Sequence, residues 1–169
     1  MTARFVLACL LQLAIVGALA FVNLAVLAGG TEILLRIEPV DPRDPLRGDS
    51  VTLQYAISSL DGRLFVSRRP NPGELVYVVL APAGQYWEAR RVDTAPPRAD
   101  VFLKGRVASA PAGAEGRVRV VYGIEQYFVA EGRGAAFDPR TRTAAAQVIV
   151  DRAGQAVVNR LFVDGRQWP

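Results

Sequence analysis

The stretch Val51 to Ser58 reads VTLQYAIS and alternates apolar with more polar side chains. Side chains at positions 51, 53, 55 and 57 fall on one side of an extended chain, and those at 52, 54, 56 and 58 on the other. This period of two predicts a β-strand with one buried face. Asp61-Gly62 follows and suits a tight hairpin because glycine tolerates positive φ. We therefore expect the strand to pair with residues 64–66.

Similar patterns continue downstream. Residues 75–81 are apolar on both faces, which is typical of a central strand, and Pro82-Ala83-Gly84 turns the chain back into residues 86–92. A last hairpin joins residues 146–151 to residues 156–163 through Arg152-Ala153-Gly154. The resulting expectation is an all-β domain, either an antiparallel sandwich or a barrel-like body.

The remaining pattern agrees with this fold class. Two segments, 101–107 and 117–122, alternate apolar and charged side chains and predict half-exposed strands. Three Pro-rich pieces, 69–73, 94–98 and 110–116, predict loops, because proline lacks the amide donor of a β-ladder. The body of the protein is expected over residues 31–169.

Residues 5–28 precede this body and contain no charged side chain; Gln12 and Asn23 supply their polarity. As a helix they would span about 36 Å, which exceeds the roughly 30 Å of a bilayer's hydrocarbon core. A cleaved signal peptide ending near Ala28 is the alternative, but the apolar regions of signal peptides usually run about 7 to 15 residues. We expect an uncleaved transmembrane anchor over residues 1–30.

The charges flanking this segment predict its orientation. Arg4 precedes it and Glu32 is the first charge after it. The positive-inside rule then places the N-terminus in the cytoplasm and the β domain outside it. Gln12 and Asn23 could hydrogen-bond a partner helix, so the lipid bilayer and an integral membrane protein are the expected partners.

Composition excludes most familiar catalytic chemistries. Among 169 residues there is no histidine, one cysteine (Cys9) and one lysine (Lys104). No cofactor is expected. A Ser-Lys hydrolase with Lys104 as base is an alternative, with Ser50, Ser58, Ser59, Ser67 and Ser109 as candidate nucleophiles.

Charge leaves one further alternative. The net charge is +4, but no basic cluster with interleaved aromatic residues is present, so no nucleic acid is expected. The arginine-rich exterior suggests instead that the domain could bind a ligand or an envelope polymer.

Five carboxylates form a candidate cluster: Asp41, Asp44, Asp49, Glu125 and Glu131. The aspartates could ligate Ca²⁺, but their spacing matches no EF-hand loop, and turn formation explains them better. The glutamates could act as an acid-base pair, whereas the simpler interpretation is a strand end followed by a Gly-rich turn. We expect no metal site.

Two segments carry a family resemblance. One reads Gly48-Asp49-Ser50-Val51-Thr52-Leu53-Gln54-Tyr55, and the other reads Tyr122-Gly123-Ile124-Glu125-Gln126-Tyr127-Phe128-Val129. They resemble the two shared blocks of the GDYXXLXY family, with Ser50 replacing the first tyrosine of its motif. The residues upstream, 39–44, and the final hairpin are similar too. The matching positions, our candidate functional residues, are Gly48, Asp49, Leu53, Tyr55, Tyr122, Gly123, Glu125, Tyr127 and Phe128.

The resemblance implies a location and a type of partner rather than a reaction. Members of the family look like bacterial membrane-anchored proteins that accompany a multispanning membrane protein, and they carry no established catalytic residues. The expectation is therefore a single-pass inner-membrane protein with a periplasmic β domain, serving as an accessory or assembly subunit.

Overall fold

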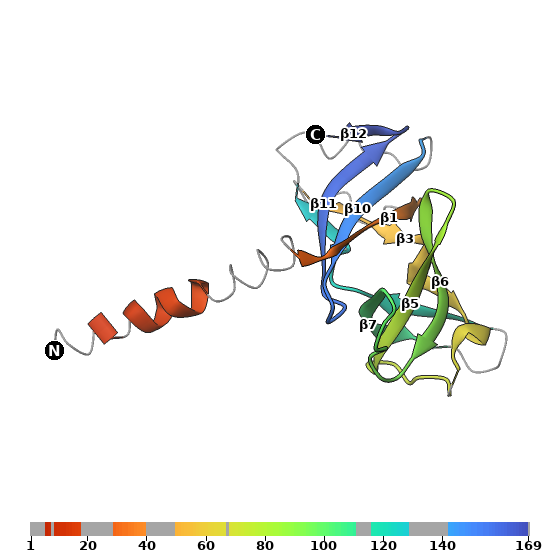
Figure 1. The fold of residues 1–169 in the computed structure, drawn as a ribbon, viewed down its shortest axis with the longest axis horizontal. Helices are drawn as coiled ribbons and strands as arrows, with labels where there is room; N and C mark the ends of the chain where they lie inside the picture. Colours follow the sequence, from red (N-terminus) through yellow and green to blue (C-terminus); the bar gives the residue numbers. More distant parts are fainter. Residues whose placement is uncertain are drawn as a thin grey trace.

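The computed structural model describes residues 6–7, 9–17, 29–39, 50–66, 68–110, 116–128 and 142–168. Most of them lie in β-strands (Figure 1). The strands are β1 (Thr31–Glu38), β2 (Ser50–Thr52), β3 (Gln54–Tyr55), β4 (Ser59–Asp61), β5 (Leu75–Ala83), β6 (Tyr86–Asp93), β7 (Phe102–Ser109), β8 (Arg117–Val121), β9 (Gln126–Phe128), β10 (Ala144–Val150), β11 (Ala156–Val163) and β12 (Arg166–Trp168). Two short 3-10 turns, η1 (Ala56–Ser58) and η2 (Gly62–Leu64), flank β4.

The described strands form two five-stranded sheets and a two-stranded ribbon. Sheet 1 has the order β12-β11-β10-β1-β3, and sheet 2 has the order β4-β8-β7-β5-β6. The ribbon pairs β2 with β9. All these strand pairs are antiparallel. In sheet 1 the N-terminal strand pairs along its length with β10, from Thr31↔Val150 to Ile37↔Ala144, so the two ends of the domain are joined.

The inner faces of the two sheets share one hydrophobic core. Sheet 1 contributes alternate residues of β1 and β10, including Leu35 and Ala146, which are also cross-strand neighbours. Sheet 2 contributes β5, β7 and β8, with Val78 and Leu103 fully buried. Leu53 and Tyr55 lie in the same cluster. Alternation with a period of two therefore gives the antiparallel all-β body that the sequence predicts.

Both predicted downstream hairpins are confirmed. Strands β5 and β6 pair up to Ala83↔Tyr86, and β5 lies inside sheet 2 between β7 and β6. Strands β10 and β11 pair from Val150↔Ala156 onward. One strand was not predicted: β12 follows a tight turn in which Asp164 and Gly165 have φ of 51° and 75°. Aspartate and glycine both tolerate this left-handed region, which a two-residue hairpin requires.

The continuous strand predicted over residues 51–58 is wrong. Leu53, Tyr55 and Ile57 are buried as the alternation requires, but the backbone forms β2, β3 and η1 instead of one strand. Ser58 is the local cause, because its Oγ accepts a hydrogen bond of 3.2 Å from the Tyr55 backbone N–H and closes a turn. Such side-chain bonds compete with a β-ladder.

The hairpin predicted at Asp61-Gly62 is also wrong. Oδ1 of Asp61 accepts a hydrogen bond of 2.8 Å from the Arg63 backbone N–H, which starts η2. The preceding strand, β4, pairs instead with β8, through Leu60↔Val118. An aspartate can cap a short 3-10 helix as readily as it can start a hairpin turn. The local sequence does not distinguish these two structures.

One face of β7 also differs from expectation. In the half-exposed strand predicted over residues 101–107, Phe102 falls on the same side as Lys104, yet only 4% of its surface is exposed. Its ring packs edge-on against Tyr77, with centroids 5.6 Å apart, and lies against Gly154 in the β10–β11 turn. A turn from the other sheet thus covers this face of β7.

Residues 9–17 form the described part of an N-terminal helix, which lies away from the sheets in Figure 1. Among the described residues, no helix combines the length and the apolar character needed to cross a membrane. The predicted loops at 69–73 and 94–98 contain no strand, and residues 111–115 of the third lie outside the described part of the chain.

Candidate functional site

The two segments that carry the family resemblance lie side by side. Strand β2 pairs with β9 in the register Val51↔Tyr127 and Thr52↔Gln126. The pairing continues past β2, since the Leu53 backbone N–H donates to the Glu125 carbonyl oxygen at 2.7 Å. Segments about seventy positions apart in the sequence are thereby joined along their backbones.

Each of these segments also presents a tyrosine to the other. The Tyr55 hydroxyl donates to the Ile124 carbonyl oxygen at 2.7 Å. The Tyr122 hydroxyl donates to the Ile57 carbonyl oxygen at 2.6 Å. Each acceptor lies two positions after the partner tyrosine, so the exchange is reciprocal.

The environment favours the neutral form of both hydroxyls. Burial raises the pKa of Tyr55, which is completely buried, and the negative charge of Glu125 acts in the same direction. Burial and then Glu125 raise the pKa of Tyr122 as well. A hydroxyl held neutral remains a hydrogen-bond donor. These tyrosines are therefore donors to the backbone and are poorly suited to act as acids near neutral pH.

Glu125 shapes the turn between β8 and β9. Its two carboxylate oxygens accept hydrogen bonds from the backbone N–H groups of Tyr122, at 2.5 Å, and Gly123, at 2.8 Å. Gly123 adopts a φ of +84°, a region that glycine enters without steric cost. Because both oxygens already bind the chain's own amides, this carboxylate serves the turn.

Gly105 on β7 is part of the same arrangement, although sequence analysis did not single it out. A Cβ at this position would lie 3.1 Å from the Tyr122 ring and would clash with Cγ1 of Val120. The missing side chain lets the Tyr122 ring approach sheet 2 closely. The one available signal was a glycine inside a predicted strand, which often marks a close approach of another group.

Comparison with known proteins identifies the family of this chain. A family model described as "GDYXXLXY protein" matches residues 12–161. The chain belongs to the GDYXXLXY family. No curated protein and no solved structure matches it.

Within the GDYXXLXY motif, the structure describes the second half. Gly48 and Asp49 lie outside the described residues. Ser50, which replaces the motif's first tyrosine, begins β2 and pairs with Phe128. Leu53 and Tyr55 are buried and bonded to the second block. The described half of the motif therefore joins two distant segments.

The two residues at the end of the second block differ in their surroundings. Tyr127 packs against the hydrophobic core. Phe128, the next residue on β9, is 78% exposed. An exposed aromatic ring on a strand is a feature of contact surfaces rather than of cores.

Of the five carboxylates in the candidate cluster, the structure describes only Glu125. Asp41, Asp44, Asp49 and Glu131 lie outside the described residues. Glu125 binds backbone amides, as shown above. Within the described ranges, no three His, Cys, Asp or Glu side chains lie close enough to hold a metal ion.

The candidate serines are only partly described, because Ser67 and the side chain of Ser50 lie outside the described residues. Lys104 is half-buried on β7, and no hydrogen bond joins its amino group to a serine among the described residues. Ser58 is buried and accepts from the Tyr55 N–H. Ser109 is exposed at the end of β7. Serine-lysine catalysis requires the two side chains within hydrogen-bond reach.

Proposed function

We propose that this GDYXXLXY protein is a membrane-anchored extracytoplasmic β domain that serves as an accessory or assembly partner of a multispanning membrane protein. The observation that carries the proposal is the exposure of the N-terminal helix. Its leucines, isoleucine and valines at positions 6–7 and 10–16 are 53% to 69% exposed. A helix with apolar side chains on all faces needs an apolar environment around it.

The length of the uncharged segment favours lipid as that environment. Residues 5–28 carry no charge and, as one helix, would cross a hydrocarbon core of about 30 Å. Arg4 on one side and Glu32 on the other favour a cytoplasmic N-terminus and a periplasmic body at the inner membrane of a bacterium.

The contacts within the β domain favour a role in binding a partner protein over a role in catalysis. Tyr55, Tyr122 and Glu125 make their hydrogen bonds to the chain's own backbone, so these three side chains are not directed at a substrate. Phe128 offers an exposed ring at the end of the β2–β9 ribbon. Together with Gln12 in the helix, it provides a second point at which a membrane partner can bind.

Two experiments test the proposal. Membranes from cells expressing the full chain are washed at alkaline pH, and a reporter fused after Pro169 reports which side the body occupies. We expect the protein to stay in the membrane pellet and the reporter to be active only in the periplasm. Release by the wash, or a cytosolic reporter, would refute the anchor.

The partner is tested by photo-crosslinking in the same membranes. A photoreactive residue replaces Gln12 in one variant and Phe128 in another, and Val66, which is 68% exposed on a different part of the body, in the control. We expect the first two positions to form adducts with one multispanning protein and the control to form none. Absence of a protein adduct at both test positions would contradict the assembly role.

A further inference from the structure

The face of sheet 1 that points away from the core carries a row of side chains in register. Arg36 on β1 is opposite Ala145 on β10, and Ala145 is opposite Phe162 on β11. Small alanine lies between two large side chains, so the surface is hollowed at its middle. The outer face of sheet 1 is therefore a concave surface with an apolar floor.

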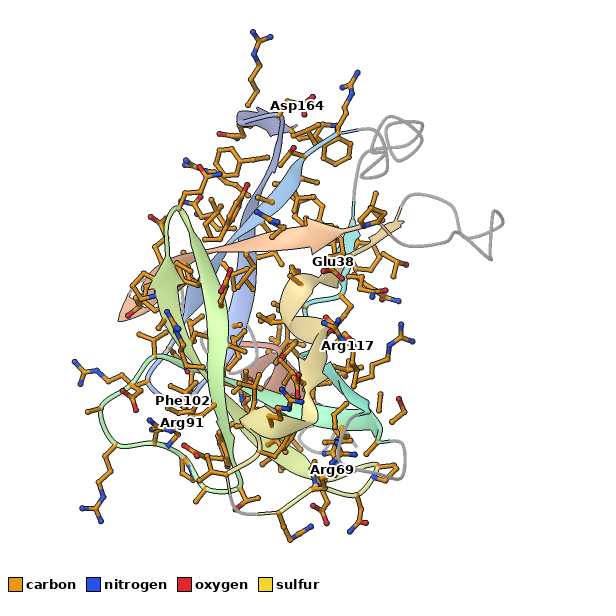
Figure 2. All side chains as sticks on the ribbon, turned by 90° about the vertical axis from the view of Figure 1, so that its right-hand side faces the viewer. Glu38, Arg69, Arg91, Phe102, Arg117 and Asp164 are labelled. Carbon is orange, nitrogen blue, oxygen red and sulfur yellow. The ribbon has the colours of Figure 1, made fainter. Side chains whose placement is uncertain are left out.

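The tip of the β5–β6 hairpin closes one side of this hollow, and the β11–β12 turn closes another. The result is a cleft of about 450 Å³. Its lining residues are Leu34, Gln85, Tyr86, Thr143, Ala145, Phe162, Asp164 and Gly165. This volume lies in the range of small-ligand sites, which is about 300 to 1,000 Å³. Figure 2 shows Asp164 at the end of the molecule toward which the hairpin points.

Two aromatic rings and an aliphatic side chain form the apolar walls. Tyr86 begins β6, Phe162 belongs to β11, and Leu34 belongs to β1. The Arg36 guanidinium lies over the Tyr86 ring, 4.9 Å from its centroid. This cation–π contact holds the Tyr86 ring in position. The cleft thus offers apolar surfaces from three strands that the fold holds together.

The rim is polar. Asp164 has one carboxylate oxygen bonded to the Thr143 backbone N–H at 3.1 Å, and the other lies 3.9 Å from Nε of Arg142. Its side chain is 55% exposed, so lone pairs remain for a further donor. The Gln85 carboxamide and the Thr143 hydroxyl complete the rim, and neither side chain hydrogen-bonds to another described residue.

We propose that this cleft binds a neutral saccharide ring. A sugar has an apolar C–H face that fits against Phe162 and Tyr86, and hydroxyl groups that can donate to Asp164 and exchange hydrogen bonds with Gln85. The Arg36 guanidinium lies over the Tyr86 ring, and the Arg142 guanidinium lies beside the Asp164 carboxylate. The charged groups near the cleft therefore already have partners within the protein, which favours a neutral ligand.

The proposal does not depend on the anchor or on a membrane partner. The cleft lies on the face of sheet 1 that points away from the core. It would give a ligand to a protein whose proposed function is to bind a membrane partner. A saccharide site on a periplasmic domain would place the protein against the glycan of the envelope. Binding in purified form and assembly in membranes can therefore fail independently.

The test uses the full chain in lipid nanodiscs, because maltoside detergents would themselves present sugar rings. Titration with a neutral oligosaccharide, the β-1,4-linked trimer of N-acetylglucosamine, and with maltotriose is followed by calorimetry. We expect saturable binding of at least one of them. Phe162→Ala and Gln85→Ala are expected to weaken it about tenfold and about threefold, respectively.

Two controls and a third cleft variant make the result decisive. Val66→Ala removes an exposed apolar side chain outside the cleft and should leave the affinity unchanged. Asp164→Asn keeps the acceptor for the Thr143 N–H and tolerates positive φ, yet removes the charge, so it should weaken binding without unfolding the turn. Melting temperatures confirm that each variant is folded.

If Phe162→Ala fails to fold, Gln85→Ala and Asp164→Asn carry the test, since both positions are exposed. Failure of the wild-type chain to bind either saccharide overturns the proposal. So does binding that all three cleft variants leave unchanged.

Discussion

Tyr55 and Tyr122 exchange hydrogen bonds, each donating to a carbonyl group two positions beyond the other. Because the two residues are far apart in the chain, this exchange joins the GDYXXLXY motif to the second family block at two points. The arrangement gives both tyrosines a structural role, since a phenylalanine ring of the same size would carry no donor for these two carbonyl oxygens.

Removing one of these hydroxyls should destabilise the domain. Tyr55→Phe leaves the Ile124 carbonyl without its donor in a buried position, and we expect a loss of about 1 to 3 kcal/mol in the free energy of unfolding. Urea unfolding of the full chain measures it. Tyr77→Phe is the matched control, because the contact of the Tyr77 ring with Phe102 is retained. Equal stability of the two variants would contradict the role assigned to Tyr55.

Alkaline pH should weaken the fold. The folded-state pKa values of Tyr55 and Tyr122 are raised, so both stay protonated at a pH where the unfolded chain begins to lose these protons. The folded state then binds more protons, and the free energy of unfolding falls as the pH rises above about 10. Below that pH the contribution is fully present.

Urea midpoints measured at pH 8 and pH 11 check this sign. The wild-type chain should lose stability between the two values, and the double variant Tyr55→Phe/Tyr122→Phe should be less stable at pH 8 but lose less on going to pH 11. A pH dependence that the double variant retains in full would show that other groups cause it.

Glu125 should stabilise the β8–β9 turn through both oxygens. Glu125→Ala removes two acceptors of backbone N–H groups and should lower the free energy of unfolding by about 1 to 3 kcal/mol. Glu125→Gln keeps one oxygen and should cost less. A protease-sensitivity assay of the same variants should show earlier cleavage near residues 121–125. If Gln and Ala variants are equally destabilised, the charge rather than the hydrogen bonds determines the effect.

Gly154 should not tolerate a side chain. It has a φ of +78°, and a Cβ would lie 2.5 Å from Cε2 of the Phe102 ring. Gly154→Ala combines backbone strain with a clash against a buried ring, so we expect a loss of about 2 to 4 kcal/mol. Gly73→Ala is the control: its φ is +86°, but no atom lies within 4 Å of the added Cβ. The difference between the two variants in thermal unfolding isolates the packing at Phe102.

Removing the N-terminal helix should leave the body intact. The described helix residues are all exposed, so deletion of residues 1–28 should change the free energy of unfolding of the β domain by less than about 0.5 kcal/mol. The shortened protein should also remain in solution without detergent. A large loss of stability would mean that the helix packs on the sheets.

The sequence alone determined the fold class and two hairpins, β5–β6 and β10–β11. Two apolar runs, 146–151 and 156–163, joined through Arg152-Ala153-Gly154, predict an antiparallel pair, because a short strand pattern and a turn glycine act within a few residues. The two family blocks were equally visible, since motif spacing is a property of the chain. The prediction from alternation failed at Ser58 and Asp61. There, a side chain accepts a hydrogen bond from a nearby backbone N–H and forms a turn in place of an extended strand or hairpin.

Only the tertiary structure decided what lies against what. Which strand pairs with β1, which face of β7 is covered, and which carbonyls receive the hydroxyls of Tyr55 and Tyr122 all depend on contacts between distant segments. The cleft beside Phe162 likewise needs a hairpin tip from one sheet above the outer face of the other. Such contacts are set by the packing of the whole core, and no window of sequence contains both partners.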